Sequence, residues 1–345
     1  MKNIRVLVVD DSAFMRKMIS DMINQSDHME TVDTARNGLD ALEKVKRFNP
    51  DVVTLDVEMP KMDGLSALKR LMKEYPVPVI MLSSLTGEGT DSTIQAIEYG
   101  AVDFITKPSG AISLNIEEVK DQLIHKITAA ATANVKQESR HNSVQTHRHQ
   151  ELLYEHSIVS IGVSTGGPKA LQTLMQQLPQ DFSAPILIVQ HMPPRFTQSL
   201  ARRLDQISHI PVKEAENGEV LKKGNAYVAP GGLQFEVKPM ARSLVANISE
   251  PTIQHGHIPS VNQLFQSLAN IDHYNLINVV LTGMGTDGSI GAQTIERHSN
   301  SYFFIAESED TAVIDGMPKS LKQTVQVNAV LPIDRIAQML SKLVQ

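Results

Sequence analysis

The chain has 345 residues, enough for about two domains, and 41% of them are hydrophobic, so each domain can bury a core. Its net charge of -6, from 32 Lys and Arg against 38 Asp and Glu, argues against binding nucleic acid through phosphate neutralisation. The absence of cysteine excludes disulfides, thiolate zinc sites and cysteine nucleophiles, and fits a reducing compartment. No apolar run approaches the roughly 18 residues of a membrane span, and no signal peptide is evident, so we expect a cytoplasmic protein.

The first domain alternates strand and helix signals. Short, β-branched apolar runs predict strands at Val6–Val9, Thr31–Ala35, Val52–Leu55, Val79–Leu82 and Val102–Ile105. Helical periodicity predicts helices at Phe14–Asn24, Gly38–Phe48, Gly64–Glu74, Asp91–Tyr99 and Glu117–Ala130. Apolar strands separated by helices indicate a parallel sheet covered on both faces. We therefore expect a doubly wound, flavodoxin-like α/β domain over residues 1–128.

A change of composition marks the end of this domain. Residues 129–156 are rich in Ala, Thr, Asn, Gln, Ser and His and show no apolar periodicity, which predicts a polar linker. The linker histidines His141, His147 and His149 could bind a metal ion. No cysteine or carboxylate completes such a site, however, and polar linkers often collect histidine.

The alternation resumes over residues 157–345. Predicted strands are Ile158–Val163, Ile186–Val189, Ala226–Ala229, Leu244–Ile248, Leu276–Leu281 and Tyr302–Ala306. Predicted helices are Lys169–Gln177, Thr197–Ile207, Val261–Asn270 and Ile333–Leu343. The segment Ala226–Ile248, with Gly231 and Gly232 between its strands, predicts an antiparallel hairpin. We expect a second doubly wound, Rossmann-like α/β domain with a mostly parallel sheet and this small antiparallel addition.

Polar side chains follow the strands of the first domain at the edge where such sheets bind ligands. Asp10 and Asp11 come directly after the first strand, and Asp56 follows the third in chain order. Three converging carboxylates repel one another unless a hard divalent cation lies among them, and Mg²⁺ is the usual choice. Ser83 and Lys107 end the fourth and fifth strands. A carboxylate surrounded by a metal, a hydroxyl and an ammonium group can accept a phosphoryl group, which makes Asp56 the central candidate.

Taken singly, these residues have plainer interpretations. Asp10 and Asp11 could cap a helix, and Asp56 could be a loop acid. Five such residues at the correct strand ends favour the phosphoacceptor site instead.

Four segments of the first domain resemble bacterial response-regulator receiver domains: 8–12, 56–64, 82–84 and 106–108. The resemblance implies that a histidine kinase phosphorylates Asp56 and that the reaction requires Mg²⁺. It also implies that Ser83 and Lys107 sense the phosphoryl group.

Three loops of the second domain each follow an apolar strand and carry one reactive side chain. These are Ser164 in a Gly-rich loop, His191 after the second strand, and Asp287 in a further Gly-rich loop. Because carboxyl ends of parallel strands gather at one edge, the three side chains should meet there as nucleophile, general base and orienting acid. The chain order Ser, His, Asp differs from that of α/β-hydrolases and of both familiar protease types, which indicates an independent hydrolase design.

Each of these residues has an alternative interpretation. The segment 164–167 could be a phosphate- or dinucleotide-binding turn, although it lacks the usual glycine spacing and a Lys-Ser/Thr ending. His191 alone could be a structural hydrogen bonder, and Asp287 alone a turn acid. His255 and His257 have no identifiable partners in the sequence.

Five segments of the second domain resemble the chemotaxis protein-glutamate methylesterase family: 161–168, 190–201, 228–232, 281–288 and 316–318. Together with the receiver domain, the resemblance spans essentially the full chain. It implies that Ser164, His191 and Asp287 form the catalytic triad. It also implies that Thr165 and the main chain at Met284 assist oxyanion binding.

The sequence departs from the family pattern at three single positions and in the segment 297–301, which lacks the usual glycines. Gln234 stands where a histidine is expected, Asn262 where an aspartate is expected, and Glu307 where a glutamine is expected. Because the triad is intact, we expect these differences to affect substrate preference or rate rather than the type of reaction.

The resemblance implies a phosphorylation-activated hydrolase that demethylates glutamate methyl esters on chemoreceptors and deamidates receptor glutamines, with no cofactor for hydrolysis. The expected partners are a chemotaxis histidine kinase and methyl-accepting chemoreceptors, without nucleic acid or membrane insertion. One alternative is a receiver joined to a non-catalytic scaffold with the esterase fold. Another is a transcriptional regulator, which the net charge and the lack of a basic DNA-reading helix disfavour.

The predicted linker is long enough for the receiver domain to regulate the second domain by contact. In the family's scheme, the unphosphorylated receiver covers the active-site edge and phosphorylation loosens that contact. A polar linker of about 25 residues would let the receiver fold back while keeping its effective concentration high.

Overall fold

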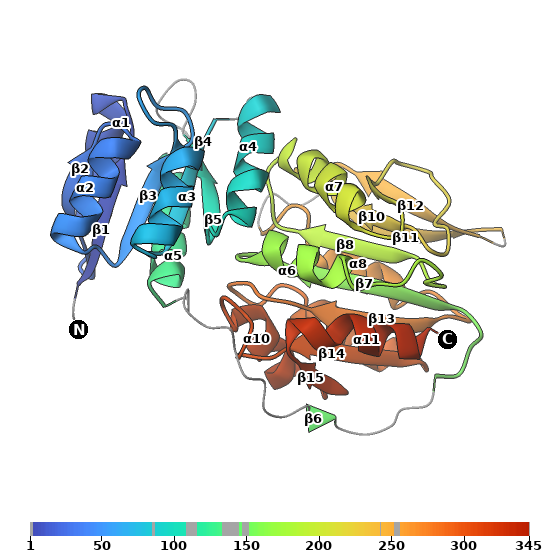
Figure 1. Ribbon diagram of the computed structural model, residues 1–345. Coiled ribbons are helices and arrows are strands. Elements are labelled where there is room, and N and C mark those ends of the chain that lie inside the picture. Colours follow the sequence, from blue (N-terminus) through green and yellow to red (C-terminus); the bar gives the residue numbers. More distant parts are fainter. Residues whose placement is uncertain are drawn as a thin grey trace. The chain divides into compact units, whose positions relative to one another are not determined.

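The computed structural model describes residues 3–84, 87–107, 116–132, 145–146, 152–241, 243–251 and 256–344. The chain divides into two compact units, Met1–Glu138 and Ser139–Gln345, and each has its own sheet (Figure 1). The linker histidines His141, His147 and His149, as well as His255, lie outside the described residues. Within the described residues, no helix combines the length and hydrophobicity needed to cross a membrane.

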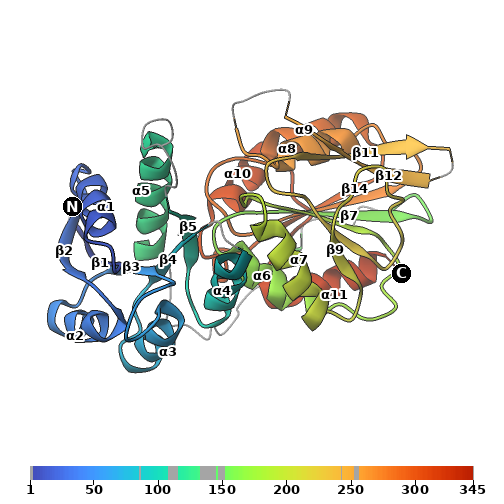
Figure 2. The ribbon, with the colours of Figure 1, turned by 90° about the horizontal axis from the view of Figure 1, so that it is seen from above.

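The first unit is a five-stranded parallel sheet in the order β2-β1-β3-β4-β5. Its strands are β1 (Ile4–Val9), β2 (Met29–Ala35), β3 (Val52–Asp56), β4 (Val79–Ser83) and β5 (Asp103–Thr106). Its helices are α1 (Ala13–Asn24), α2 (Gly38–Phe48), α3 (Gly64–Glu74), α4 (Gly87–Glu98) and α5 (Ile116–Thr132). Helices α1 and α5 cover one face, and α2, α3 and α4 the other (Figure 2). The expected doubly wound domain is confirmed, and its strand order reverses between β1 and β3.

The second unit is built on an eight-stranded sheet in the order β6-β15-β14-β13-β7-β8-β10-β9. Its strands are β6 (Gln145–Thr146), β7 (Ser157–Val163), β8 (Ile186–Gln190), β9 (Val212–Glu214), β10 (Ala226–Val228), β13 (Asn275–Val280), β14 (Tyr302–Glu307) and β15 (Ala329–Leu331). All pairings are parallel except that of the edge strand β6 with β15. The mostly parallel second domain is therefore confirmed, with its strand order reversing between β7 and β13.

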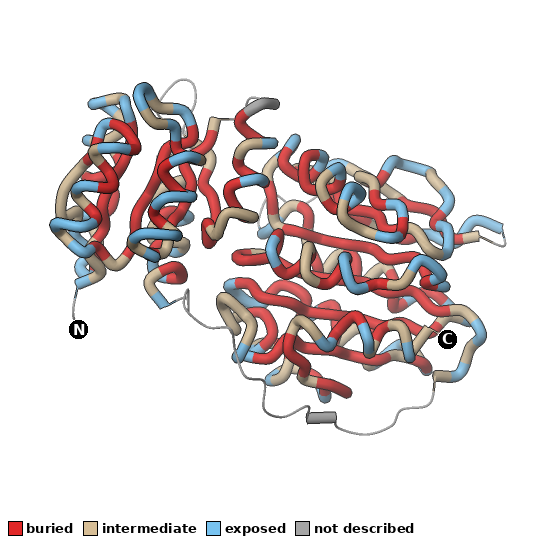
Figure 3. Tube along the Cα trace, in the orientation of Figure 1, coloured by how far each residue is buried: buried red, intermediate tan, exposed pale blue. Residues whose placement is uncertain are grey.

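In the part of the unit that the structure describes, six helices cover this sheet. They are α6 (Gly167–Met175), α7 (Phe196–Ile207), α8 (Val261–Leu268), α9 (Ser289–His298), α10 (Gly316–Thr324) and α11 (Ile333–Leu343). Helices α6, α7 and α11 lie on one face, and α8, α9 and α10 on the other (Figure 2). The central strands are buried along their length (Figure 3), as expected for a sheet covered on both sides.

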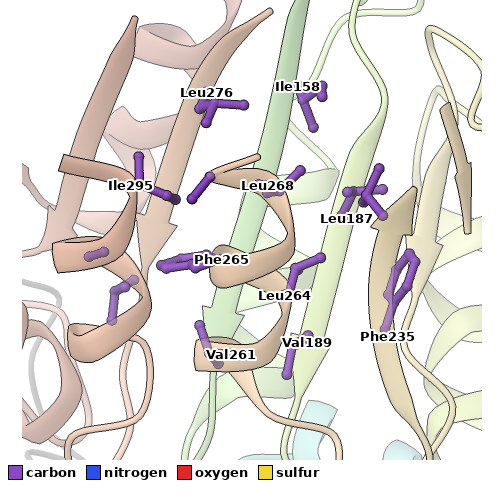
Figure 4. Packing of buried hydrophobic residues seen from close by; sticks show 14 of the residues in the cluster. Ile158, Leu187, Val189, Phe235, Val261, Leu264, Phe265, Leu268, Leu276 and Ile295 are labelled. Atoms are coloured by element: carbon purple, nitrogen blue, oxygen red, sulfur yellow. The ribbon is translucent and has the colours of Figure 1, made fainter. Parts of the chain in front are cut away.

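Helix α8 anchors a hydrophobic core of this unit. Its apolar residues recur every three or four positions, so that Val261, Phe265 and Leu268 face the sheet and are fully buried (Figure 4). They pack with Ile158 of β7 and Leu276 of β13 in one hydrophobic cluster. This packing fixes the N-terminal end of α8 beside the ends of β7 and β13.

The predicted hairpin exists, but its strands differ from those expected. The antiparallel pair is β11 (Gln234–Met240) with β12 (Ser243–Ser249). The expected first strand, now β10, instead pairs in parallel with β8 and β9 in the main sheet. The turn at Gly231 and Gly232 therefore joins the main sheet to the hairpin. The prediction erred because a Gly-Gly pair marks a change of direction without specifying which strands pair across it.

Candidate active site and phosphoacceptor site

The three loops that carry Ser164, His191 and Asp287 meet at the point where the second sheet reverses its strand order. Ser164 follows β7, His191 follows β8, and Asp287 lies in the loop after β13. Because β13, β7 and β8 are consecutive neighbours in the sheet, their carboxyl ends lie side by side at one edge, where open α/β sheets bind ligands.

Backbone contacts place Ser164 next to the other two loops. Val163 and Gln190 are register partners across β7 and β8, so Ser164 and His191 occupy the next position on strands that lie about 5 Å apart. The His191 N–H donates to the Val163 carbonyl oxygen over 3.1 Å. On the other side, the Ser164 N–H donates to the carbonyl oxygen of Thr282 over 3.0 Å. Gln190 ties the first two loops together, because its Nε2 donates to the Ser164 carbonyl oxygen over 2.9 Å.

Gly283 allows the third loop to approach this closely. A Cβ atom at Gly283 would lie 2.8 Å from the Cβ of Ser164 and 2.4 Å from the sulfur of Met317. Any side chain at position 283 would therefore push the third loop away from Ser164.

His191 and Asp287 form a buried hydrogen-bonded pair. Nε2 of His191 lies 2.8 Å from Oδ2 of Asp287, and the two side chains are 8% and 7% exposed. Since a carboxylate can only accept, the proton of a neutral His191 is on Nε2 and its Nδ1 carries the free electron pair. Nδ1 is buried and has no hydrogen-bond partner among the described residues. The ring is therefore held in the tautomer that a general base requires.

The N-terminal end of α8 holds the Asp287 carboxylate in place. Oδ2 accepts from the N–H of Val261 over 2.8 Å, and Oδ1 accepts from the N–H of Asn262 over 2.9 Å and the hydroxyl of Ser260 over 3.0 Å. Burial by itself would raise the pKa of Asp287. The hydrogen bond from His191 and those from the helix outweigh that effect and lower the pKa. Asp287 is therefore ionised at neutral pH and able to orient the imidazole.

His257 is a site residue that sequence reasoning did not find. Its ring stacks on the ring of His191 with centroids 3.9 Å apart and an interplanar angle of 15°. Desolvation lowers the pKa of His257, and His191 lowers it further. A neutral His257 can thus support the imidazole of His191 without adding charge. The sequence offered no signal for this contact, because His257 lies 66 residues after its partner.

The three single-position departures from the family pattern all lie in the structure around the predicted triad. Gln234 accepts the Ser260 N–H on Oε1 over 3.0 Å, and Ser260 in turn donates to Asp287. Asn262 Oδ1 accepts from the N–H groups of Gly288 and Gly291 over 3.0 and 2.7 Å, at the start of α9. Glu307 accepts the N–H of Thr282 over 2.8 Å. Each of the three therefore positions a residue that contacts Ser164 or Asp287.

The two residues expected to assist oxyanion binding are each next in sequence to a residue of the site: Thr165 follows Ser164, and Met284 follows Gly283. Thr165 is buried, and its carbonyl oxygen accepts the hydroxyl of Thr282 over 2.9 Å. Met284 follows Gly283 and is 38% exposed.

The three acidic residues predicted to bind a metal ion lie together in the first unit, at the carboxyl ends of β1 and β3. Asp10, Asp11 and Asp56 offer oxygen atoms within 4.8 Å of one another. Nζ of Lys107 lies 2.8 Å from Oδ2 of Asp10 and 2.7 Å from Oδ2 of Asp56. Burial raises the pKa of Asp56 to about 6, although Lys107 opposes this rise. Two buried carboxylates and one exposed carboxylate, with a single ammonium group between them, fit a hard divalent cation.

Ser83 also lies at the strand end where the sequence predicts it. Ser83 is fully buried at the end of β4, and its hydroxyl accepts from the hydroxyl of Thr93 in α4 over 2.6 Å. Its own hydroxyl lies 3.2 Å from the carbonyl oxygen of Gly89. A Cβ at Gly64 would lie 2.0 Å from the carbonyl oxygen of Asp56, so only glycine lets the loop after Asp56 close onto α3.

Together, the fold and the two sites define a two-domain α/β protein in which a receiver-type acidic site precedes a serine-hydrolase-type site. The CheB methylesterase family matches residues 159–340, and the response regulator receiver domain family matches residues 6–117. The chain belongs to the CheB methylesterase family.

Full-length relatives and a solved structure agree with this assignment. The chain is 50% identical to a protein-glutamate methylesterase/protein-glutamine glutaminase of Oceanobacillus iheyensis, over 99% of both chains. It is 49% identical to the protein of the same description from Geobacillus kaustophilus, over 100% of this chain and 99% of the relative. The crystal structure of the Thermotoga maritima CheB methylesterase catalytic domain aligns with a TM-score of 0.51 at 40% identity, covering 55% of this chain and 98% of that domain.

Proposed function

We propose that this protein hydrolyses γ-glutamyl methyl esters on chemoreceptors and deamidates receptor glutamines, under control of receiver phosphorylation. One observation carries the hydrolase assignment. The buried His191–Asp287 pair leaves the basic Nδ1 of His191 free, beside the position of Ser164 in the sheet. A non-catalytic scaffold would have no need for an imidazole held in this tautomer.

In the proposed mechanism, Ser164 attacks the ester carbonyl carbon while its proton passes to Nδ1 of His191. The negative charge of Asp287 stabilises the imidazolium that forms. The tetrahedral intermediate collapses when its C–O bond to methanol breaks, and His191 returns the proton to the departing oxygen. Water, activated by His191, then attacks the carbonyl carbon of the acyl-enzyme; its bond to the oxygen of Ser164 breaks, which restores the serine hydroxyl and leaves a glutamate side chain on the receptor. With a glutamine substrate, the leaving group is ammonia and the acyl-enzyme is the same.

The oxyanion of the tetrahedral intermediate requires hydrogen-bond donors close to Ser164. We assign this role to Thr165 and to the main chain at Met284. Two features support the assignment: Thr165 directly follows the nucleophile, and Gly283, which precedes Met284, lies close against Ser164.

We assign phosphorylation to Asp56. Asp10, Asp11 and Asp56 would hold Mg²⁺, which offsets the negative charge of the carboxylates and of the incoming phosphoryl group. Lys107 would bind a phosphoryl oxygen. Ser83 would leave its contact with Thr93 to do the same, which would link phosphorylation to α4.

The expected phosphodonor is a chemotaxis histidine kinase, and the expected site of action is the cytoplasmic part of the receptors. We propose a receiver domain at residues 1–128, a linker at 129–156 and a catalytic domain at 157–345. The two matched families, at residues 6–117 and 159–340, support this division.

Release of methanol from methylated receptor membranes tests the proposed function. With a small phosphodonor and Mg²⁺ present, the wild-type chain should release methanol. Ser164→Ala should lose on the order of 10³-fold or more in kcat. Ser341→Ala, which removes a hydroxyl from α11, is the matched control and should remain fully active. Release by Ser164→Ala at the wild-type rate would refute the assignment of the nucleophile.

A further inference from the structure

Glu307 is a buried carboxyl group that the proposed mechanism leaves unused. It is the last residue of β14 and is 1% exposed. Its Oε2 accepts the N–H of Thr282 over 2.8 Å, and its Oε1 accepts the hydroxyl of Thr311 over 2.9 Å. No described cation forms an ion pair with it. A buried carboxyl without a cationic partner is costly, which points to a role in placing what it binds.

Thr282 links Glu307 to the nucleophile loop. The carbonyl oxygen of Thr282 accepts the N–H of Ser164 over 3.0 Å. The hydroxyl of Thr282 donates to the carbonyl oxygen of Thr165 over 2.9 Å and accepts the N–H of Ile314 over 3.0 Å. The carbonyl oxygen and the hydroxyl of Thr282 therefore join the Ser164 loop to a neighbouring segment. Glu307 accepts the one remaining polar group, the N–H of Thr282.

We propose that Glu307 is a positioning residue for hydrolysis, acting through Thr282 on the Ser164 loop and on the adjoining Gly283–Met284 segment. This inference rests on the proposed function. Without Glu307, the buried N–H of Thr282 would lose its partner, and the segment that fixes Ser164 would shift. Displacements of about 1 Å can cost on the order of 10²-fold in rate when reacting groups must meet in one geometry.

The charge of Glu307 adds a second effect. Burial, with a smaller contribution from Asp315, which is paired with Lys322, raises the pKa of Glu307 to about 7, against the lowering effect of the hydrogen bonds from Thr282 and Thr311. Asp315 is the one described titratable group whose charge acts on Glu307. In the neutral form, the carboxyl can donate to Thr311 and still accept from Thr282. In the ionised form, a negative charge lies behind the segment that would receive the oxyanion, so ionisation should slow formation of the tetrahedral intermediate.

Two substitutions separate placement from charge. Glu307→Gln keeps an acceptor for Thr282 and a donor for Thr311 but never ionises. Glu307→Leu removes both. Asn328→Leu is the matched control, because the buried side chain of Asn328 likewise accepts a strand N–H, that of Phe304, over 2.7 Å within the same sheet.

The experiment uses the full chain with phosphodonor and Mg²⁺, and follows methanol release together with the rate at which a fluorophosphonate labels Ser164. Glu307→Leu should lose about 10- to 100-fold in kcat and in labelling rate with KM unchanged, while folded Asn328→Leu stays within about twofold of wild type. Glu307→Gln should match wild type near pH 6 and exceed it by about fivefold near pH 8, because the charge is missing.

The outcomes distinguish this inference from the proposed function. If wild type releases no methanol, the proposed function fails, whereas labelling of Ser164 still tests the placement by Glu307. If wild type is active and Glu307→Leu loses no more than Asn328→Leu, Glu307 has only a structural role and the inference is wrong. A ratio of Glu307→Gln to wild-type activity that stays constant from pH 6 to pH 8 would overturn the effect of charge.

Discussion

The ring of His257 stacks on the ring of His191, the general base of the proposed triad, with the two ring centroids 3.9 Å apart. This contact fixes the plane of the imidazole, whose Nε2 is already held by Asp287. A lowered pKa keeps His257 neutral at pH values at which an ordinary histidine begins to ionise. The stack can thus orient His191 while the imidazolium forms during acyl transfer.

The stack leads to the first prediction. His257→Phe keeps an aromatic ring and should retain kcat within about threefold. His257→Arg places a permanent positive charge about 4 Å from the developing imidazolium and should lower kcat by at least tenfold. Methanol release at pH 7.5 measures both. Equal activity of the two variants would show that the charge at position 257 is irrelevant to the base.

The second prediction concerns Asn262, which accepts two N–H groups at the start of α9. Asn262→Leu leaves the N–H groups of Gly288 and Gly291 without this acceptor and should lower the free energy of unfolding by about 1–3 kcal/mol. Asn262→Asp keeps the acceptor and should unfold close to wild type. Urea unfolding of the full chain provides the measurement, with Gln263→Leu on the same helix as the control. A Leu variant as stable as the control would show that these hydrogen bonds contribute nothing.

The third prediction follows from the raised pKa of Asp56. Its folded-state pKa of about 6 exceeds the ordinary value of 3.8, so between these pH values the folded state binds more protons than the unfolded state. The free energy of unfolding should therefore fall as pH rises from 4 to 6, by at most about 3 kcal/mol. Asp56→Asn removes the ionisable group and should unfold at a higher temperature than wild type at pH 7.5 without divalent cation.

Addition of Mg²⁺ extends this test. At pH 7.5, Mg²⁺ should raise the unfolding temperature of wild type more than that of Asp56→Asn or Asp10→Asn, and labelling of Asp56 by a phosphodonor should stop in EDTA. Asp27→Asn, which neutralises an exposed carboxylate of the same unit, should behave as wild type. Phosphate incorporation at an unchanged rate in EDTA would contradict the metal assignment.

The fourth prediction concerns regulation by the receiver. If the unphosphorylated receiver covers the active-site edge, the second unit alone should release methanol faster than the unphosphorylated full chain. About 2 kcal/mol of preference for the covered state would hide the site roughly 95% of the time. The truncated chain should begin at Ser139, because β6 pairs with β15 and Leu153 and Tyr154 donate to Ser301 and Asn275.

The phosphorylated full chain should release methanol at least as fast as the truncated chain when the two are measured at equal concentration. If the truncated chain is no faster than the unphosphorylated full chain, the receiver does not act by simple occlusion.

Local patterns in the sequence determined much of this protein. The apolar, β-branched strand runs and the helical periodicity predicted α2, α3 and α11 with the bounds that the structure gives them. Because parallel strands share one ligand-binding edge, polar residues at strand ends could be grouped from the sequence alone. This reasoning placed Asp10 with Asp56, and Ser164 with His191.

Only the tertiary structure decided the contacts that depend on register and on packing between distant segments. No local pattern specifies that β10 joins the main sheet rather than the hairpin, since its pairing partner is chosen by burial against β8. The stack of His257 on His191, and the link from Glu307 through Thr282 to Ser164, join residues 66 to 143 positions apart in the chain. Such contacts arise where separate loops converge at the sheet edge, and their geometry is set by the packing beneath them.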